Sequence, residues 1–210
     1  MKNNYDKIAR YYDLLSRTVF QRSLINAQTC LLPYIKENSV ILIVGGGTGW
    51  ILEEIAKIRP GGLQITYVEI SEGMIKLSQK RDYKQNNVQF VHQSIETFTP
   101  TFSYDVILTP FLFDNFPAVK ATVIFTKLHT TLKSGGNWLF VDFVYDPRHG
   151  KLWQKLLLKT MYTFFRVFSK IEASELNDME GLFNRHQYLK IYEQFHYGRF
   201  IWSVAYRKEK

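Results

Sequence analysis

The sequence predicts an α/β fold, a three-layer sandwich in which a seven-stranded, mostly parallel sheet ends in an antiparallel hairpin. Two observations support this prediction. From residue 40 to residue 144, β-rich runs and helical patterns alternate strictly, which is typical of parallel strands joined by right-handed crossovers. The last two β-rich runs, 187–195 and 200–207, are separated by only a few residues around Gly198, which indicates an antiparallel hairpin.

A chain of 210 residues is long enough for one well-buried α/β domain and short for two. We therefore expect a single domain (1–210) with an N-terminal helical cap over 1–36, a cofactor-binding core over 37–145, and a helical lid with the hairpin over 146–210. The sequence has no N-terminal segment that resembles a secretory signal, and it has no apolar run close to the ~20 residues needed to span a bilayer. With a single cysteine, Cys30, these features predict a cytoplasmic protein.

The expected core elements follow from apolar periodicity and from punctuating residues. The strands are expected at 40–44, 64–69, 88–91, 104–108 and 137–144, and the helices at 49–59, 71–81 and 117–132. Pro60 stops the first helix, Ser71 is placed as the N-cap of the second, and Gly135-Gly136 is expected to close the third as a glycine C-cap. Further helices are expected over 5–34, 151–170 and 174–184.

The glycine-rich turn at residues 45–49 carries the main functional signal. It follows an apolar strand and leads directly into a helix that begins near Trp50. Glycine lets backbone amides approach a ligand where a Cβ would collide, and a helix start supplies unpaired N–H groups. Twenty residues after Gly49, the next strand ends in Glu69, where a carboxylate can accept hydrogen bonds from ribose hydroxyls. The pattern predicts a nucleoside-cofactor site.

The spacing of the glycines indicates which nucleoside cofactor is bound. Dinucleotide folds usually follow G-x-G-x-x-G, whose last small residue lets the helix lie close to the strand. In this chain the pattern is G-x-G-x-G, and the bulky Trp50 occupies the position of the small residue. This disfavours a pyrophosphate at the helix start, and hence an NAD-dependent oxidoreductase. It favours a cofactor without phosphate, such as S-adenosylmethionine.

The chain resembles the class I S-adenosylmethionine-dependent methyltransferases. The features that carry the resemblance are the glycine turn, the acidic strand end, the segment 104–113, the Leu132–Gly136 motif and the C-terminal hairpin. The resemblance extends from about residue 5 to residue 207 and implies their Rossmann-like fold. It implies that Glu69 holds the ribose hydroxyls and that Met74 packs on the adenine. The cofactor-binding residues that it implies are Gly45, Gly46, Gly47, Gly49, Glu69, Ile70, Met74, Ser94, Ile95 and Thr109.

Two positions depart from the family pattern. Ile43 stands where the family commonly has Asp or Glu, and Ser94 stands where Asp is common. A serine hydroxyl can still accept a hydrogen bond from the adenine amino group, but without charge assistance. These departures keep open the alternative of a non-catalytic protein that binds S-adenosylmethionine or S-adenosylhomocysteine.

Methyl transfer from a sulfonium mainly requires that donor and acceptor be positioned, with a general base only for an acceptor that must lose a proton. The predicted catalytic residues are Asp114, Thr109 and Tyr12, with Tyr5, Phe111 and Phe113 as further acceptor contacts. Asp114 is the main candidate for binding or deprotonating a polar acceptor; alternatively, it caps the following helix. His149 is another possible base. The five histidines and the single cysteine show no metal-ligand spacing.

Several features bear on the acceptor. Thr109-Pro110-Phe111 lacks the Asn/Asp-Pro-Pro pattern of enzymes that methylate nucleobase amines. The net charge of +8 is spread along the chain, so nucleic acid is a disfavoured partner and an RNA methyltransferase a weaker alternative. The 151–170 helix has a basic face and an opposite apolar arc, which suits a lid or peripheral membrane contact. We therefore expect a small methyl acceptor of apolar character.

Overall fold

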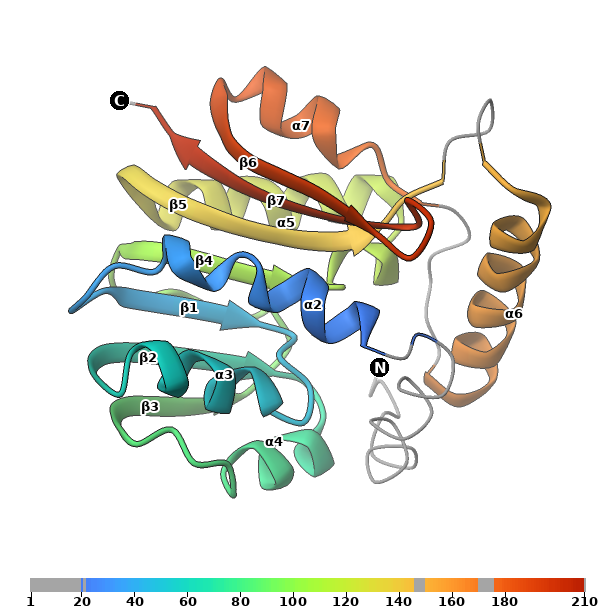
Figure 1. Ribbon diagram of the computed structural model, residues 1–210. Coiled ribbons are helices and arrows are strands. Elements are labelled where there is room, and N and C mark those ends of the chain that lie inside the picture. Colours follow the sequence, from blue (N-terminus) through green and yellow to red (C-terminus); the bar gives the residue numbers. More distant parts are fainter. Residues whose placement is uncertain (1–19, 21, 146–149, 170–175, 210) are drawn as a thin grey trace.

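The computed structural model describes residues 20, 22–145, 150–169 and 176–209 (Figure 1). A seven-stranded sheet lies at its centre, with strand order β3-β2-β1-β4-β5-β7-β6. The first five strands run parallel, and β7 pairs antiparallel with both β5 and β6. The predicted sheet and its C-terminal hairpin are therefore confirmed.

The elements have the following bounds. The strands are β1 (Val40–Val44), β2 (Gly61–Glu69), β3 (Gln85–His92), β4 (Tyr104–Pro110), β5 (Leu132–Phe143), β6 (Tyr188–His196) and β7 (Ile201–Lys208). The α-helices are α2 (Ser23–Thr29), α3 (Trp50–Ile58), α4 (Glu72–Ser78), α5 (Ala118–Thr131), α6 (Leu152–Ser169) and α7 (Met179–Arg185). Two short 3-10 helices, η2 (Leu32–Tyr34) and η3 (Phe113–Asn115), complete the set among the described residues.

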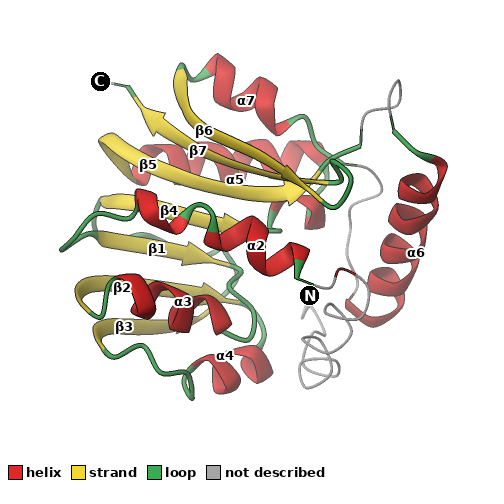
Figure 2. Cartoon of the chain, in the orientation of Figure 1, coloured by secondary structure: helices red, strands yellow, loops and turns green. Residues whose placement is uncertain are grey.

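Helices cover both faces of the sheet, which makes the three layers (Figure 2). On one face α2 and α3 bury their apolar sides against β1, where Ile51 packs in the same cluster as Ile41. On the other face α5 and α7 pack over β5, and the Phe125 and Phe183 rings lie 4.9 Å and 5.1 Å from Trp138. Burial of large apolar side chains on both faces is what holds a central sheet between helical layers.

Helix α6 lies beyond the carboxyl ends of the parallel strands, on the right of Figure 1. Its first turn is attached to the β6–β7 hairpin, because the buried Gln154 donates from Nε2 to the carbonyl of Gly198 at 2.8 Å. Leu152 and Leu156 are 87% and 67% exposed, so the predicted apolar arc is only partly buried. No helix in the described parts of the chain has the length and apolar character to cross a membrane.

The prediction that glycines cap the third core helix is wrong. Helix α5 ends at Thr131, and Leu132 already has extended backbone (φ −80°, ψ 127°) at the start of β5. Gly135 and Gly136 lie inside β5, where the pairing with β4 shifts register between Tyr104 and Val106. Gly135 has φ +75°, so the glycines serve an irregularity of the strand instead of a helix end.

Ser71 is confirmed as the N-cap of α4, since its hydroxyl accepts the Met74 N–H at 3.2 Å. The helix is shorter than predicted and ends at Ser78. Of the predicted N-terminal helix over 5–34, the structure describes α2 and η2. Tyr5 and Tyr12 of that segment, and His149 after β5, lie outside the described residues.

Candidate functional site

The turn between β1 and α3 has the backbone of a ligand-binding loop. Gly45, Gly47 and Gly49 have φ values of +72°, +63° and +79°, a region that side chains with a Cβ rarely adopt. Their surroundings differ. A Cβ on Gly49 would lie 2.6 Å from the Cα of Ser78, whereas a Cβ on Gly47 would meet nothing within 4 Å. Gly49 therefore serves close packing of α3 on α4, and Gly47 forms the open side of the turn.

Gly45 and Gly46 face protein instead of open space. A Cβ on Gly46 would lie 2.5 Å from the ring of Tyr67, and one on Gly45 would lie 3.3 Å from Leu112 Cδ1. These two glycines let neighbouring side chains approach the turn. Among the glycines of the turn, Gly47 is the one at which a Cβ would meet open space.

Glu69 ends β2 directly beside this turn, because β1 and β2 are parallel neighbours. Its carboxylate is 7% exposed and accepts two backbone N–H groups, from Gly47 at 3.1 Å and from Ser71 at 3.0 Å. Burial raises the pKa of Glu69, and these backbone donors oppose the rise. Each carboxylate oxygen accepts one backbone bond and keeps a further lone pair, which fits the two vicinal hydroxyls of a ribose.

Sequence reasoning missed Tyr67, which completes the turn. This fully buried tyrosine donates its hydroxyl hydrogen to the carbonyl of Gly47 at 2.9 Å. The sequence does contain a signal for this role of Tyr67, because residues 67 and 69 lie two apart on one strand and so point to the same face of the sheet. Tyr67 and Glu69 together hold Gly47 by its carbonyl and its N–H, which fixes the open peptide.

The other predicted cofactor residues have more varied positions. Met74 and Ile95 are 2% and 4% exposed, and Ile95 belongs to the apolar core. Ile70 is half-buried, and its carbonyl lies 3.0 Å from His92 Nε2. The Ser94 hydroxyl donates to Glu96 at 2.9 Å.

Ile43, the departure in β1, is fully buried in the apolar cluster beneath α2 and α3. It therefore offers no polar group to a cofactor.

The end of β4 combines a buried hydroxyl with a strained backbone. Thr109 is fully buried and accepts the indole N–H of Trp138 at 2.9 Å, which gives its hydroxyl a structural partner. Phe111 has φ +51°, and its N–H donates to the carbonyl of Val141 at 2.8 Å. Strained non-glycine residues of this kind cluster at functional sites.

Asp114 follows β4 and lies close to a second carboxylate that sequence reasoning missed, Asp142. Asp142 is 3% exposed near the end of β5 and accepts the N–H groups of Phe113 at 3.0 Å and Phe143 at 2.8 Å. Asp114 accepts from the side-chain amide of Asn115 at 2.7 Å. The signal for Asp142 in the sequence is a carboxylate within an otherwise apolar strand, since an aspartate is rarely buried unless its carboxylate has partners.

Both carboxyl groups hold their protons more tightly than ordinary aspartates. Burial raises the pKa of Asp142 to about 7, although backbone donors oppose the rise. Burial also raises the pKa of Asp114 well above its usual range, and the charge of Asp142 adds to this. The alternative role of Asp114 as a helix cap is not supported, because Pro117 is the N-cap of α5 and no side chain caps that helix.

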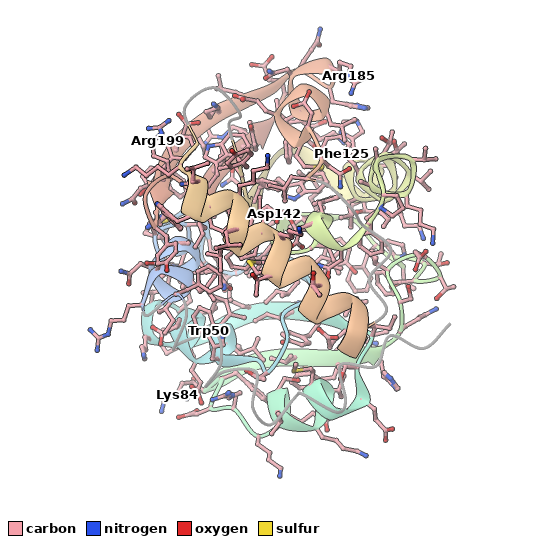
Figure 3. All side chains as sticks on the ribbon, turned by 90° about the vertical axis from the view of Figure 1, so that its right-hand side faces the viewer. Trp50, Lys84, Phe125, Asp142, Arg185 and Arg199 are labelled. Atoms are coloured by element: carbon pink, nitrogen blue, oxygen red, sulfur yellow. The ribbon has the colours of Figure 1, made fainter. Side chains whose placement is uncertain are left out.

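A cavity of about 950 Å³ opens beside this carboxyl pair. Its walls come from η3, the end of β5, the first turn of α6, the start of α7 and the β6–β7 hairpin. Figure 3 looks onto the carboxyl ends of the parallel strands, with α6 in front, Asp142 near the centre and Arg199 toward the outer edge. The cavity thus lies at the same edge of the sheet as the glycine turn, and one of its walls is η3, which follows β4.

Comparison with known proteins gives a consistent result. Residues 41–136 match the family model of a methyltransferase domain. A malonyl-[acyl-carrier protein] O-methyltransferase of Ilyobacter polytropus is 30% identical over 146 residues, which cover 70% of this chain and 54% of that protein. The enzyme of the same name from Priestia megaterium is 28% identical over 145 residues, covering 68% and 51%. The chain spans about half the length of these curated relatives.

Solved structures support the same fold. The 1,6-didemethyltoxoflavin-N1-methyltransferase of Burkholderia thailandensis, solved with bound 1,6-didemethyltoxoflavin and S-adenosylhomocysteine, superposes with a TM-score of 0.65. The match covers 99% of this chain and 87% of that one at 15% sequence identity. At this level of identity the likeness concerns the architecture, including the sheet edge at which the glycine turn and the cavity lie.

Proposed function

Because the chain belongs to the class I S-adenosylmethionine-dependent methyltransferases, we propose that it transfers a methyl group from S-adenosylmethionine to a small organic acceptor. One observation carries the proposal. The open peptide of Gly47 and the buried carboxylate of Glu69 lie within hydrogen-bonding distance of each other at the end of two neighbouring parallel strands. This arrangement suits a nucleoside whose ribose is held by Glu69 and whose amino-acid end lies along the turn.

When bound, the cofactor supplies a sulfonium methyl group that is already activated for displacement. The residues of the chain then need to orient the two reactants and exclude water. Glu69 fixes the sugar, the turn fixes the amino-acid end, and the side chains after β4 face the acceptor. Preorganisation is expected from Tyr67, which holds the Gly47 carbonyl through a buried hydroxyl.

We propose a small molecule with an apolar body as the acceptor, because aromatic side chains make up much of the cavity wall. The curated relatives are named for a malonyl group on a carrier protein, and the solved neighbour for a toxoflavin precursor. The relatives match only part of their length, so neither acceptor is carried over to this chain. A nucleic-acid acceptor is disfavoured by the Thr109-Pro110-Phe111 sequence after β4.

Calorimetry with S-adenosylhomocysteine and with NAD, run side by side, tests the proposed function. We expect binding of the thioether and none of NAD. Glu69→Ala should weaken the affinity for S-adenosylhomocysteine by about 1–3 kcal/mol, the range for hydrogen bonds to a charged group. Glu72→Gln is the control, because Glu72 is an exposed acid of α4. Tight NAD binding without a response to the thioether would overturn the proposal.

Two alternatives give different outcomes in the same preparation. A non-catalytic binding protein would bind S-adenosylhomocysteine but turn over no acceptor. An RNA methyltransferase would bind RNA with an affinity that falls steeply with salt concentration.

A further inference from the structure

We propose that the cavity beside Asp114 and Asp142 recognises a methyl acceptor that carries a protonated amine on an aromatic or apolar body, and that Asp114 accepts the proton of that amine. The inference rests on the proposed function, because it names the class of acceptor for the same reaction. It is carried by the chemistry of the cavity wall, where the buried polar groups next to the end of β4 are hydrogen-bond acceptors.

Asn177 supplies the first of these acceptors. Its side-chain Nδ2 donates to the carbonyls of Phe113 and Phe116, both at 2.8 Å. Since a carbonyl can only accept, these two bonds fix which end of the amide is nitrogen. The opposite atom, Oδ1, is buried and has no hydrogen-bond partner among the described residues, although Asn177 lines the cavity. A buried acceptor without a donor is costly, so this atom indicates a ligand that donates.

The two carboxyl groups supply the other acceptors. Backbone N–H groups of Phe113 and Phe143 hold Asp142 in place, whereas Asp114 accepts from the side-chain amide of its neighbour Asn115 and from its own backbone N–H. Asp114 therefore has spare acceptor capacity at the cavity wall. A primary ammonium group carries three N–H donors and a positive charge. It matches the unpartnered amide oxygen of Asn177 and the carboxyl pair of the half-buried Asp114 and the buried Asp142. A carboxylate ligand would instead add a further negative charge and no donor.

Several of the other charged groups that the described residues place around the cavity already have partners. On α7, Glu180 pairs with Lys190 at 2.9 Å, and Asp178 accepts the Gly181 N–H at 3.0 Å. On the hairpin, the guanidinium of Arg199 stacks on Phe195 at 3.9 Å and lies toward the outer edge in Figure 3. Lys151, before α6, and Tyr145, after β5, are the other titratable groups that the described residues contribute to the wall.

Apolar rings form the rest of the wall and suit the body of such an acceptor. The aromatic side chains that line the cavity are Phe113, Phe140, Phe143, Tyr145, Phe195 and Trp202. Aromatic faces attract a desolvated cation, and they also provide apolar area for a ring or chain. The cavity volume of about 950 Å³ is in the range of small-molecule sites.

The reaction balances with the groups present. The ammonium gives one proton to the Asp114 carboxylate, and the freed lone pair on nitrogen forms the new N–C bond. As that bond forms, the C–S bond of the sulfonium breaks and its electron pair stays on sulfur. The products are an N-methylated ammonium, which carries the positive charge of the former sulfonium, and S-adenosylhomocysteine, and the proton passes from Asp114 to solvent when the product leaves.

Calorimetry on the protein saturated with S-adenosylhomocysteine tests the inference. The probes are phenethylamine and its carboxylate counterpart 3-phenylpropionate, which share the ring and the length. We expect the amine to bind and the carboxylate not to bind. Asp114→Asn should weaken amine binding by at least about tenfold, as expected for removing a charged hydrogen-bond partner. Asp82→Asn, the same change at an exposed position on another part of the surface, should leave it unchanged.

The pH dependence gives a second readout that a structural role of Asp114 would not produce. The raised pKa values of both aspartates mean that the pair retains a proton near neutral pH. An arriving ammonium expels that proton, so amine affinity should rise with pH between pH 6 and 8, by up to about tenfold per pH unit for one proton. The rise should become smaller in Asp114→Asn, in which Asp142 is the remaining carboxyl group of the pair.

The outcomes separate this inference from the proposed function. If S-adenosylhomocysteine binds but 3-phenylpropionate binds as well as phenethylamine, the inference fails and the proposed function stands. If amine affinity is the same in Asp114→Asn at every pH, the inference fails in the same way. If S-adenosylhomocysteine does not bind, the proposed function fails, whatever the amine does.

Discussion

The glycine turn and the acidic cavity lie at the same edge of the sheet, but they are built in opposite ways. At the turn, close contacts and hydrogen bonds hold each group, down to the carbonyl and N–H of Gly47. In the cavity, the half-buried Asp114 lies close to the buried Asp142, and Asn177 keeps a buried oxygen that has no partner among the described residues. The comparison indicates that the hydrogen bonds of the turn are made without its ligand, whereas the acceptors of the cavity wall need the donors of a ligand.

The packing of the turn gives the largest expected effect. In Gly49→Ala the new methyl group would meet the Cα of Ser78 at 2.6 Å, and the backbone has φ +79°. Backbone atoms cannot move aside as a flexible side chain can. We expect the free energy of unfolding to fall by about 2–5 kcal/mol, combining overpacking with left-handed strain, as measured by denaturant unfolding.

Gly135→Ala is the matched control for this variant. Gly135 has a similar φ of +75°, but a Cβ there would meet nothing within 4 Å. It should lose only the backbone contribution, about 1–2 kcal/mol. Equal losses in the two variants would show that the turn is not closely packed, and the contrast with the cavity would disappear.

The carboxyl pair should make stability depend on pH. The pKa of Asp142 is about 7 in the folded protein, against an ordinary 3.8. Its contribution is therefore fully present below about pH 4 and is lost as the pH rises through 7. For one proton the free energy of unfolding should fall by up to about 1.4 kcal/mol per pH unit over this window, measured by urea unfolding at several pH values.

Asp114→Asn separates the pair from the other titrating groups. The variant lacks the titration of Asp114, whose pKa is raised by burial and by the charge of Asp142, so the slope should become smaller. The variant should gain stability relative to the wild type as the pH rises from 5 to 8. Parallel stability curves for the two proteins would mean that the carboxyl groups do not interact, which would remove the main difference between the cavity and the turn.

The same contrast explains what could be predicted from the sequence. The turn is a local motif, in which consecutive glycines and the acid at the end of the next strand carry the signal, so Gly47 and Glu69 were found together. Tyr67 was missed because its role depends on a contact between two strands. The error over Gly135 has a similar cause, since a glycine pair after a helix predicts a cap unless the pairing of β5 with β4 is known.

The cavity could not be predicted in this way. Its groups come from segments that are far apart in the chain, with Asp114 after β4, Asp142 in β5 and Asn177 before α7. Asp114 was identified from its place after the fourth strand, but its partner was not. Asn177 gives no signal by itself, because its significance depends on two carbonyls that fix the orientation of its amide.

Thr109→Val tests whether Thr109 has only a structural role or also contacts the cofactor. The hydroxyl of Thr109 accepts the indole N–H of Trp138, and the variant would leave that donor buried without a partner. We expect a loss of about 1–3 kcal/mol in the free energy of unfolding, with unchanged affinity for S-adenosylhomocysteine. A loss of affinity that exceeds the loss of stability would instead support the predicted contact of Thr109 with the cofactor.

The outer surface of α6 should give the smallest effect. Leu156 is 67% exposed, so Leu156→Gln removes little buried area and should change the free energy of unfolding by less than about 0.5 kcal/mol. Leu157→Gln, on the half-buried side that packs against the sheet, should cost more.

The exposed Lys155 and Lys159 lie near Leu156, and sedimentation with anionic lipid vesicles would test the predicted membrane contact. Vesicle binding that weakens in Leu156→Gln at unchanged stability would give this face a role other than packing. Equal stability losses in the two variants would mean that α6 has no distinct packed side.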